Sequence, residues 1–346
     1  MSTYMSTGMS ALMPPRLVCL DLRGERIRRM RTLPPPAVLC LGNFDGVHLA
    51  HAALIRRGHE LAHAIRTRQN GQGDPETICA VFCFFHPSGD YFLPPDTLPT
   101  HLTTLKERIE AIRNLGVDAV WLCDFPSVKD LAPTDFLELL QTDCHAVGAV
   151  CGYNHRFGKQ ASGSPALLES FFGAESVDVL PAMEMDGIPV SSTRIRTCLY
   201  AGDVETAQRL LGRPYSLESR VLHGKSLGHI WGFPTANQNF PADRIIPAHG
   251  VYAVTCHTPK GVYPGVANVG LRPTVEYHAR LRRVNCETHI IGFSGNIYDQ
   301  IIRVEFLKFI RPERRFDSVD DLKAAIRRDT EAADAYIRAR FSELLT

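Results

Sequence analysis

Short runs of apolar residues alternate with longer amphipathic segments between about residue 16 and residue 212. Buried strands are predicted where the apolar run is continuous, at residues 37–41, 78–85, 117–122, 146–151 and 177–180. Helices are predicted where apolar positions recur every three or four residues, at residues 48–68, 102–114, 134–141 and 165–172. Regular alternation of this kind is typical of a doubly wound α/β fold, in which helices cover both faces of a parallel sheet.

Two further helices are predicted at the end of this half, separated by Ala201 and Gly202. Asp203 has the side chain of a helix N-cap, and Gly212 is a residue that commonly ends a helix. From residue 213 the pattern changes, because glycine and proline become frequent and short β-rich runs recur at residues 250–257, 262–269, 285–291 and 301–309. These runs predict a small antiparallel β-barrel.

A last helix is predicted to begin after Ser318, where Asp321 completes a start that resembles a capping box, and to end near residue 340. The patterns together predict three segments. These are a flexible tail at residues 1–15, an α/β domain at residues 16–212, and a β-barrel domain with a C-terminal helix at residues 213–346.

The composition narrows the class of protein. The 38 basic and 37 acidic residues leave a formal net charge of +1, which argues against a nucleic-acid or membrane partner but allows a local basic pocket for phosphates. No apolar run reaches the roughly 18 residues that span a bilayer, and residues 1–15 lack the basic start and apolar core of a secretory signal. Ten cysteines without a CxxC pair favour reduced core thiols in a cytoplasmic protein over a disulfide framework or a zinc site.

The first candidate site is the segment GNFDGVHLAH at residues 42–51, which follows a predicted strand and leads into a predicted helix. Its glycines allow the backbone to approach a ligand, and the helix start offers free N–H groups that suit a phosphate. His48 and His51 add donors that can stabilise charge moving between phosphate oxygens. Surface histidines after a glycine turn are the simpler alternative, and a zinc site lacks a third ligand nearby.

The second candidate site is the segment HGKSLGHIWGFPTAN at residues 223–237. Gly224, Gly228 and Gly232 allow a backbone that folds around phosphates, and Lys225 can neutralise part of their charge. Thr235 and Asn237 lie two apart on a predicted strand, so their oxygens face the same side. Hard oxygen ligands of this kind suit Mg²⁺ beside ATP phosphates.

Both segments, in order, resemble signatures of the prokaryotic bifunctional riboflavin kinase/FMN adenylyltransferase (FAD synthetase) family, whose first module is an HxGH nucleotidylyl transferase. The resemblance extends through the motifs FHP at residues 85–87, CGYNHRFG at 151–158, VSSTRIR at 190–196, GVANVGLRPT at 265–274 and ETHI at 287–290. It covers nearly all of residues 35–330 and implies two reactions. ATP phosphorylates riboflavin to FMN, and a second ATP adenylylates FMN to FAD with release of pyrophosphate.

For adenylyl transfer, the resemblance implies that His48 and His51 contact the ATP phosphates and stabilise the leaving pyrophosphate. Further expected ATP-binding residues come from the same two motifs: Gly42, Phe44, Asp45, Ser192, Thr193 and Arg196. Asn154 is expected to place the phosphate of FMN. Two departures from the family pattern stand out, since Ala50 replaces the glycine of HxGH, and Asn154 with His155 replaces an acidic–aromatic pair. The residues 191–193 could also serve simply as a helix cap.

For the kinase reaction, the resemblance implies that Glu287 is the general base for the riboflavin 5′-hydroxyl, with Mg²⁺ held by Thr235 and Asn237 and with Arg311 beside Phe316 closing the flavin pocket. A general base at this position makes physical sense, because an alcohol attacks better when its proton is accepted during attack. Asp299 stands where the family has a turn glycine. Two alternatives stay open: a monofunctional riboflavin kinase whose N-terminal domain is degenerate, and a non-catalytic flavin-binding protein.

Overall fold

The computed structural model describes residues 17–23, 28–68, 76–94, 100–223, 233–271, 284–341 and 343. By their contacts these residues form two compact units, Met1–Thr97 with Leu105–Met183, and Leu98–Thr104 with Glu184–Thr346. The chain therefore enters the second unit briefly at residues 98–104 before it completes the first. The predicted boundary between an α/β domain at residues 16–212 and a barrel domain at residues 213–346 stays a prediction.

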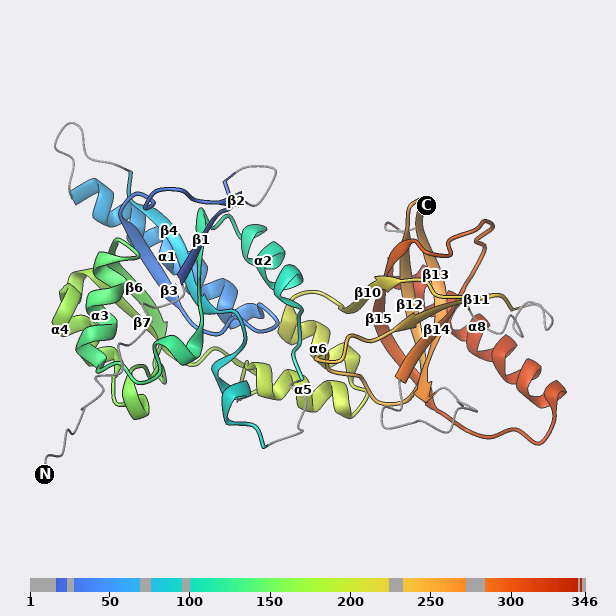
Figure 1. The fold of residues 1–346 in the computed structure, drawn as a ribbon. Coiled ribbons are helices and arrows are strands. Elements are labelled where there is room, and N and C mark those ends of the chain that lie inside the picture. The colour runs from blue at the N-terminus through green and yellow to red at the C-terminus, as the bar shows by residue number, and fades with distance from the viewer. Residues whose placement is uncertain are drawn as a thin grey trace, which may run out of the picture. The chain divides into compact units, whose positions relative to one another are not determined.

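The first unit is built on a seven-stranded sheet (Figure 1). Its strands are β1 (Leu17–Asp21), β2 (Arg28–Arg29), β3 (Ala37–Leu41), β4 (Ile78–Phe84), β5 (Ala119–Cys123), β6 (Ala146–Gly152) and β7 (Val177–Leu180). They lie in the order β2-β1-β5-β4-β3-β6-β7, and the five strands from β5 to β7 are parallel. This parallel sheet confirms the predicted α/β class.

Helices cover both faces of this sheet, as the alternation of strands and helices predicted. They are α1 (Leu49–Arg68), α2 (Leu105–Arg113), α3 (Pro133–Thr142) and α4 (Pro165–Phe172). Val38 and Cys40 of β3 pack in one buried cluster with α1 and α2, whereas Leu39 packs in another with α3 and α4. Successive residues of β3 thus point to opposite faces, and both faces are apolar, which explains its unbroken apolar run.

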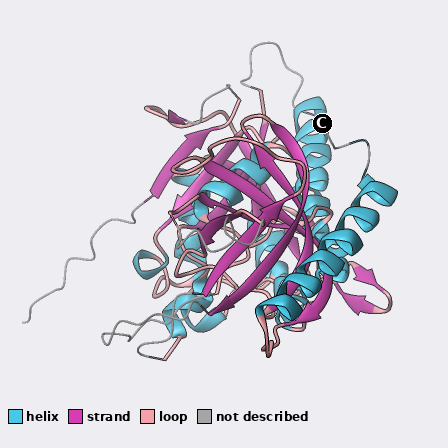
Figure 2. Cartoon of the chain, turned by 90° about the vertical axis from the view of Figure 1, so that its right-hand side faces the viewer, coloured by secondary structure: helices cyan, strands magenta, loops and turns pink. Residues whose placement is uncertain are grey.

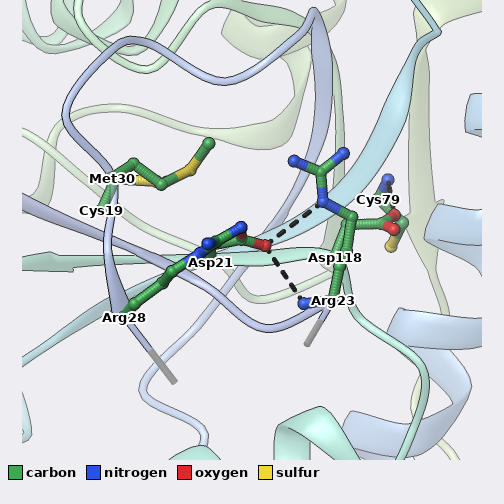
Figure 3. Close-up of polar contacts among 7 residues, drawn as sticks. All are labelled: Cys19, Asp21, Arg23, Arg28, Met30, Cys79 and Asp118. Atoms are coloured by element: carbon green, nitrogen blue, oxygen red, sulfur yellow. Dashed lines mark hydrogen bonds and ion pairs between the residues drawn. The ribbon is translucent and has the colours of Figure 1, made fainter. Parts of the chain in front are cut away.

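The edge of the sheet at β1 and β2 was not predicted, and β1 is antiparallel both to β5 and to β2. Asp21 lies at its end and is 5% exposed. Its carboxylate accepts hydrogen bonds from Arg23 (Figure 3) and from Arg28. Burial alone would raise the pKa of Asp21, but these hydrogen bonds outweigh burial and lower the pKa. An ionised carboxylate therefore ties the two arginines to the edge strand.

The second unit contains a six-stranded antiparallel sheet of the predicted barrel type, whose curl is visible in Figure 2. Its strands are β10 (Tyr215–Arg220), β11 (Thr235–Asn239), β12 (Gly250–Thr258), β13 (Gly261–Leu271), β14 (Val284–Ile290) and β15 (Ile301–Pro312), in the order β10-β15-β12-β13-β14-β11. Gln238 of β11 is fully buried, and its Nε2 donates to the carbonyls of Ser219 and Ile302. This side chain joins the last strand of the sheet to the first two. A separate hairpin, β8 (Glu184–Met185) with β9 (Ile188–Pro189), begins the unit.

In the described part of the second unit the helices are α5 (Ser192–Tyr200), α6 (Val204–Leu211) and α8 (Val319–Phe341). The predicted caps are confirmed, since Asp203 accepts a hydrogen bond from the amide of Thr206, and Gly212 has the left-handed conformation that ends α6. Ser318 likewise accepts from the amide of Asp321 at the start of α8. No helix in the described part of the chain is long and apolar enough to cross a membrane.

Candidate functional site

The turn after β3 has an unusual backbone conformation. Leu41 ends the strand, α1 begins at Leu49, and Phe44, Gly46 and Val47 in between have positive φ angles of 53°, 82° and 42°. Non-glycine residues rarely adopt this conformation, and they do so mainly at constrained functional turns. Phe44 and Asp45 are 0% and 2% exposed as whole residues. A contact of these two residues with ATP stays a prediction.

His48 and His51 lie together at the start of α1. Their rings are stacked, with centroids 3.7 Å apart and an angle of 14° between the planes. The amide of His51 donates to Nδ1 of His48, and the ring of Phe44 lies 4.8 Å from that of His51. Two imidazoles are therefore held side by side beside a helix N-terminus, at the carboxyl edge of parallel strands, which is where open α/β sheets bind ligands.

A buried arginine that the sequence analysis did not select braces the same turn. Arg108 of α2 is 3% exposed, and its guanidinium donates to the carbonyls of Asn43, Phe84 and Phe85 at 3.0, 2.8 and 2.6 Å. The signal was present in the sequence, because Arg108 shares the apolar face of α2 with Leu105 and Ile112, where a charge is unusual.

The segment after β6 places Asn154 at the same edge of the sheet, exposed to solvent. Its neighbour His155 has a ring nitrogen, Nε2, that is buried without a hydrogen-bond partner among the described residues. The ring lies against Phe157, with centroids 5.8 Å apart. Burial, with a smaller contribution from the charge of Arg156, lowers the pKa of His155 to about 4. The imidazole of His155 is therefore neutral at pH 7.

The motif at residues 190–196 starts α5, in the second unit. Ser191 is the N-cap, since its Oγ accepts a hydrogen bond from the amide of Arg194. Ser192 and Thr193 are the first helical residues, and Nε of Arg196 donates to the carbonyl of Thr100. The motif therefore does cap a helix, which was the simpler alternative for residues 191–193. An approach of Ser192, Thr193 and Arg196 to the ATP phosphates stays a prediction, as does the role of Gly42.

The predicted kinase residues of the barrel form one row across neighbouring strands. Asn237 of β11 lies opposite Glu287 of β14, and Glu287 lies opposite Asn268 of β13. Directly opposed residues of antiparallel strands point to the same face of the sheet. Thr235, two residues before Asn237, shares that face. The sheet therefore gathers a hydroxyl, two amides and a carboxylate on one surface.

Neighbouring polar groups orient this row. Nδ2 of Asn285, a residue that is 5% exposed, donates to Oε1 of Glu287 at 3.0 Å. Nδ2 of Asn268 donates to Glu313 at 3.2 Å. Asn268 and Asn285 were not selected as site residues, because their contribution depends on strand register rather than on a local motif.

The other predicted kinase residues are not part of this row. Arg311 of β15 is paired with Asp329 of α8, with Nη2 2.7 Å from Oδ2, and its guanidinium also lies 5.6 Å from the ring of Phe316. The arginine therefore anchors the C-terminal helix, and a contact with flavin stays a prediction. Gly224, Lys225, Gly228 and Gly232 lie outside the described residues.

The cysteines lie mostly in the interior. All ten are free, and nine of them are buried. Burial raises the pKa of Cys151, for example, to about 12. Among the described residues, no group of three or more histidine, cysteine, aspartate or glutamate side chains could hold a metal ion.

Comparison with known families matches both parts of the chain. A family model described as FAD synthetase matches residues 31–194, and one described as riboflavin kinase matches residues 211–337. Proteins named bifunctional riboflavin kinase/FMN adenylyltransferase are similar over most of the chain. The one from Pseudomonas fluorescens is 35% identical, with 90% of this chain and 97% of the relative covered. The one from Bacillus subtilis is 33% identical, with 87% and 92% covered.

A solved structure is also similar to the whole chain. It is titled a crystal structure of a macrolide-efflux protein from Streptococcus pneumoniae, with a TM-score of 0.77 and 29% identity, and it covers 88% of this chain and 95% of its own. A third relative named bifunctional riboflavin kinase/FMN adenylyltransferase, from Escherichia coli K12, is 34% identical over 298 residues, with 84% of this chain and 90% of the relative covered. The matches extend across both units.

Proposed function

Because the chain belongs to the family of bifunctional riboflavin kinase/FMN adenylyltransferases, we propose how its residues carry the two reactions. The enzyme phosphorylates riboflavin with ATP to give FMN, and it adenylylates FMN with a second ATP to give FAD. The riboflavin kinase match over residues 211–337 supports the proposal that the first reaction takes place on the barrel. The FAD synthetase match over residues 31–194 supports the proposal that the second takes place on the α/β sheet.

The observation that carries the kinase assignment is the row of Asn237, Glu287 and Asn268 on one face of the barrel sheet. Glu287 would accept the proton of the riboflavin 5′-hydroxyl as its oxygen attacks the γ-phosphorus of ATP. Asn285 would hold the carboxylate in place through its 3.0 Å hydrogen bond. Proton acceptance by a positioned carboxylate contributes typically 10²- to 10⁴-fold to the rate.

Thr235 and Asn237 fit a divalent cation, because both carry hard oxygens and both share the face of Glu287. We propose that they hold Mg²⁺, which when bound would neutralise charge on the ATP phosphates. Lys225 and the glycines at positions 224, 228 and 232 would surround the nucleotide, as their motif predicts. Free buried thiols throughout the chain further support a cytoplasmic protein.

For adenylyl transfer, the stacked pair His48 and His51 would donate to the phosphates of ATP while the FMN phosphate attacks the α-phosphorus. Asn154 would orient the attacking phosphate, and Arg196 with the start of α5 would contact the triphosphate. The protein does little covalent chemistry in such a displacement, so that positioning and charge stabilisation carry the rate. The methyl group of Ala50 is half-buried in α1, so it does not overfill a closed core.

The monofunctional alternative is not favoured, because both family models match and the relatives are named for both activities. The direct assay is product analysis of the purified chain. Riboflavin, ATP and Mg²⁺ should give FMN and then FAD, and FMN with ATP should give FAD alone. FMN accumulation without any FAD would restore the monofunctional hypothesis, and no FMN at all would refute the kinase assignment.

The role of Glu287 is tested by Glu287→Gln, which keeps the shape of the side chain but cannot accept the proton. We expect kcat of FMN formation to fall roughly 100-fold or more, while FAD formation from supplied FMN stays within about twofold. Glu218→Gln, on β10 of the same sheet, is the matched control and should leave both activities unchanged. A fully active Glu287→Gln enzyme would mean that another group is the base.

The role of the histidine pair is tested by His48→Ala. We expect roughly a 100-fold or greater loss of FAD formation with unchanged formation of FMN from riboflavin. His63→Ala removes an exposed histidine from the same helix and should change neither. Equal loss of both activities in His48→Ala would contradict independent sites.

A further inference from the structure

The strongest unassigned feature of the first unit is the buried guanidinium of Arg108. A charge that is only 3% exposed is costly to bury, and proteins normally pair it with a carboxylate. Here the partners are three main-chain carbonyls, and no carboxylate forms an ion pair with Arg108 among the described residues. Its Nε, also buried, has no hydrogen-bond partner there. The fold thus keeps an uncompensated positive charge in its interior.

The three carbonyls show what this charge holds. Asn43 follows Gly42 in the turn that leads to His48, and its carbonyl accepts from Nη1. Phe84 and Phe85 end the neighbouring strand β4, and both of their carbonyls accept from Nη2. Strands β3 and β4 are adjacent and parallel. One planar guanidinium therefore fastens the ends of two neighbouring strands at the edge where the phosphates are expected.

A second set of contacts joins the same two segments. Nδ2 of Asn43 donates to Oγ of Ser88, and the amide of Ser88 donates to Oδ1 of Asn43, both at 3.4 Å. Asn43 is thus held by its carbonyl from α2 and by its side chain from the segment after β4. The turn itself has positive φ angles at Phe44 and Val47, a conformation that persists only when its surroundings fix it.

We propose that Arg108 is a positioning residue for adenylyl transfer. It fixes the turn at residues 42–47 so that the backbone and the histidine pair meet the ATP phosphates, and its uncompensated charge raises the local affinity for those phosphates. The proposal rests on the assignment of adenylyl transfer to the first unit. It predicts an effect specific to ATP, because the residue acts on the phosphate-binding turn and not on the flavin.

The test uses the full-length chain with Arg108→Met, which removes charge and donors at similar volume, and Arg108→Lys, which keeps the charge but loses the planar fork. In the FMN-plus-ATP assay, Arg108→Met should raise KM for ATP about tenfold or more and lower kcat/KM roughly 100-fold, with KM for FMN unchanged. Arg108→Lys should lower kcat/KM for ATP roughly tenfold. FMN formation from riboflavin serves as the internal control, and Arg56→Met, an exposed arginine of α1, as the matched variant; both should stay normal.

A merely structural role would reduce the folded fraction of the first unit, which lowers kcat and leaves both KM values unchanged. That result in Arg108→Met or Arg108→Lys would overturn the proposal, as would wild-type kinetics in either variant. If Arg108→Met does not fold, the KM for ATP of Arg108→Lys decides. Absence of FAD formation by the wild-type chain would instead refute the adenylyl transfer assignment. Calorimetric titration with ATP would then still test whether Arg108→Lys weakens nucleotide binding.

Discussion

The buried ring nitrogen Nε2 of His155 makes the stability of the first unit dependent on pH. The pKa of this histidine is lowered from its ordinary value of 6.5 to about 4, so in acid the unfolded chain binds a proton that the folded chain does not. The contribution of a neutral His155 to stability is therefore complete above about pH 6.5 and is lost as the pH falls toward 4. Because of the difference between these two pKa values, the free energy of unfolding falls by about 2 kcal/mol between pH 7 and pH 5.

Replacement of the ring separates this effect from other titrations. His155→Phe keeps an aromatic side chain beside Phe157 but removes the proton-binding nitrogen. At pH 7 we expect the free energy of unfolding of the variant to be between 0 and about 1 kcal/mol higher than that of the wild type, because Nε2 has no partner among the described residues. At pH 5 its advantage should grow by about 2 kcal/mol.

The measurement is urea unfolding at a series of pH values, followed by the fluorescence of Trp121. This residue lies in β5 of the first unit, and the chain has only two tryptophans. A Trp231→Phe background therefore makes the signal specific to that unit. His63→Gln, which removes an exposed histidine, should keep the wild-type slope. A constant difference between wild type and His155→Phe from pH 7 to pH 5 would refute the reasoning.

Three further predictions concern packing. Gly58→Ala in α1 should destabilise the first unit by about 1–3 kcal/mol in urea unfolding, because its Cβ would lie 2.4 and 2.9 Å from two buried sulfurs; Gly89→Ala, with nothing within 4 Å, should be neutral. A fragment of residues 184–346 should melt at least about 5 °C higher in calorimetry than a fragment of residues 213–346, since the latter lacks α5 and α6; equal melting would mean that these helices add nothing. Gln238→Leu should cost the second unit about 2–3 kcal/mol in chemical unfolding, because the buried carbonyl of Ile302 and the half-buried carbonyl of Ser219 lose their donor; wild-type stability would contradict that.

Local patterns were enough to predict most of the elements. The run at residues 37–41 is buried at every position and forms β3 with the predicted bounds, because a strand covered on both faces needs no polar alternation. The caps at Asp203 and Gly212 were predictable for the same reason, since they depend on one or two side chains. β10 (Tyr215–Arg220) was not predicted, because only Tyr215 and Leu217 are buried in a strand that is otherwise polar.

Features that depend on distant residues could not be read from the sequence. The row of Asn237, Glu287 and Asn268 requires the register of three strands, and only two of its members stood in motifs that suggested chemistry. Arg108 has its partners 23, 24 and 65 residues away. The packing of α5 and α6 on the barrel, for example through the bond from the amide of Ala248 to the carbonyl of Leu199, is likewise invisible to local periodicity.

The brief passage of residues 98–104 through the second unit has a consequence for synthesis on the ribosome. His101 donates its amide to Asp243 and accepts one from Ile245, and Arg244 donates to the carbonyl of Leu102. All strands of the first unit have emerged once residue 180 has left the exit tunnel, so its sheet can form early. The partners of His101, residues 243 and 245, are translated some 60 residues after residue 180. A nascent chain can therefore hold the finished sheet of the first unit while His101 and Leu102 still lack their partners, which exist only once residues 243–245 are made.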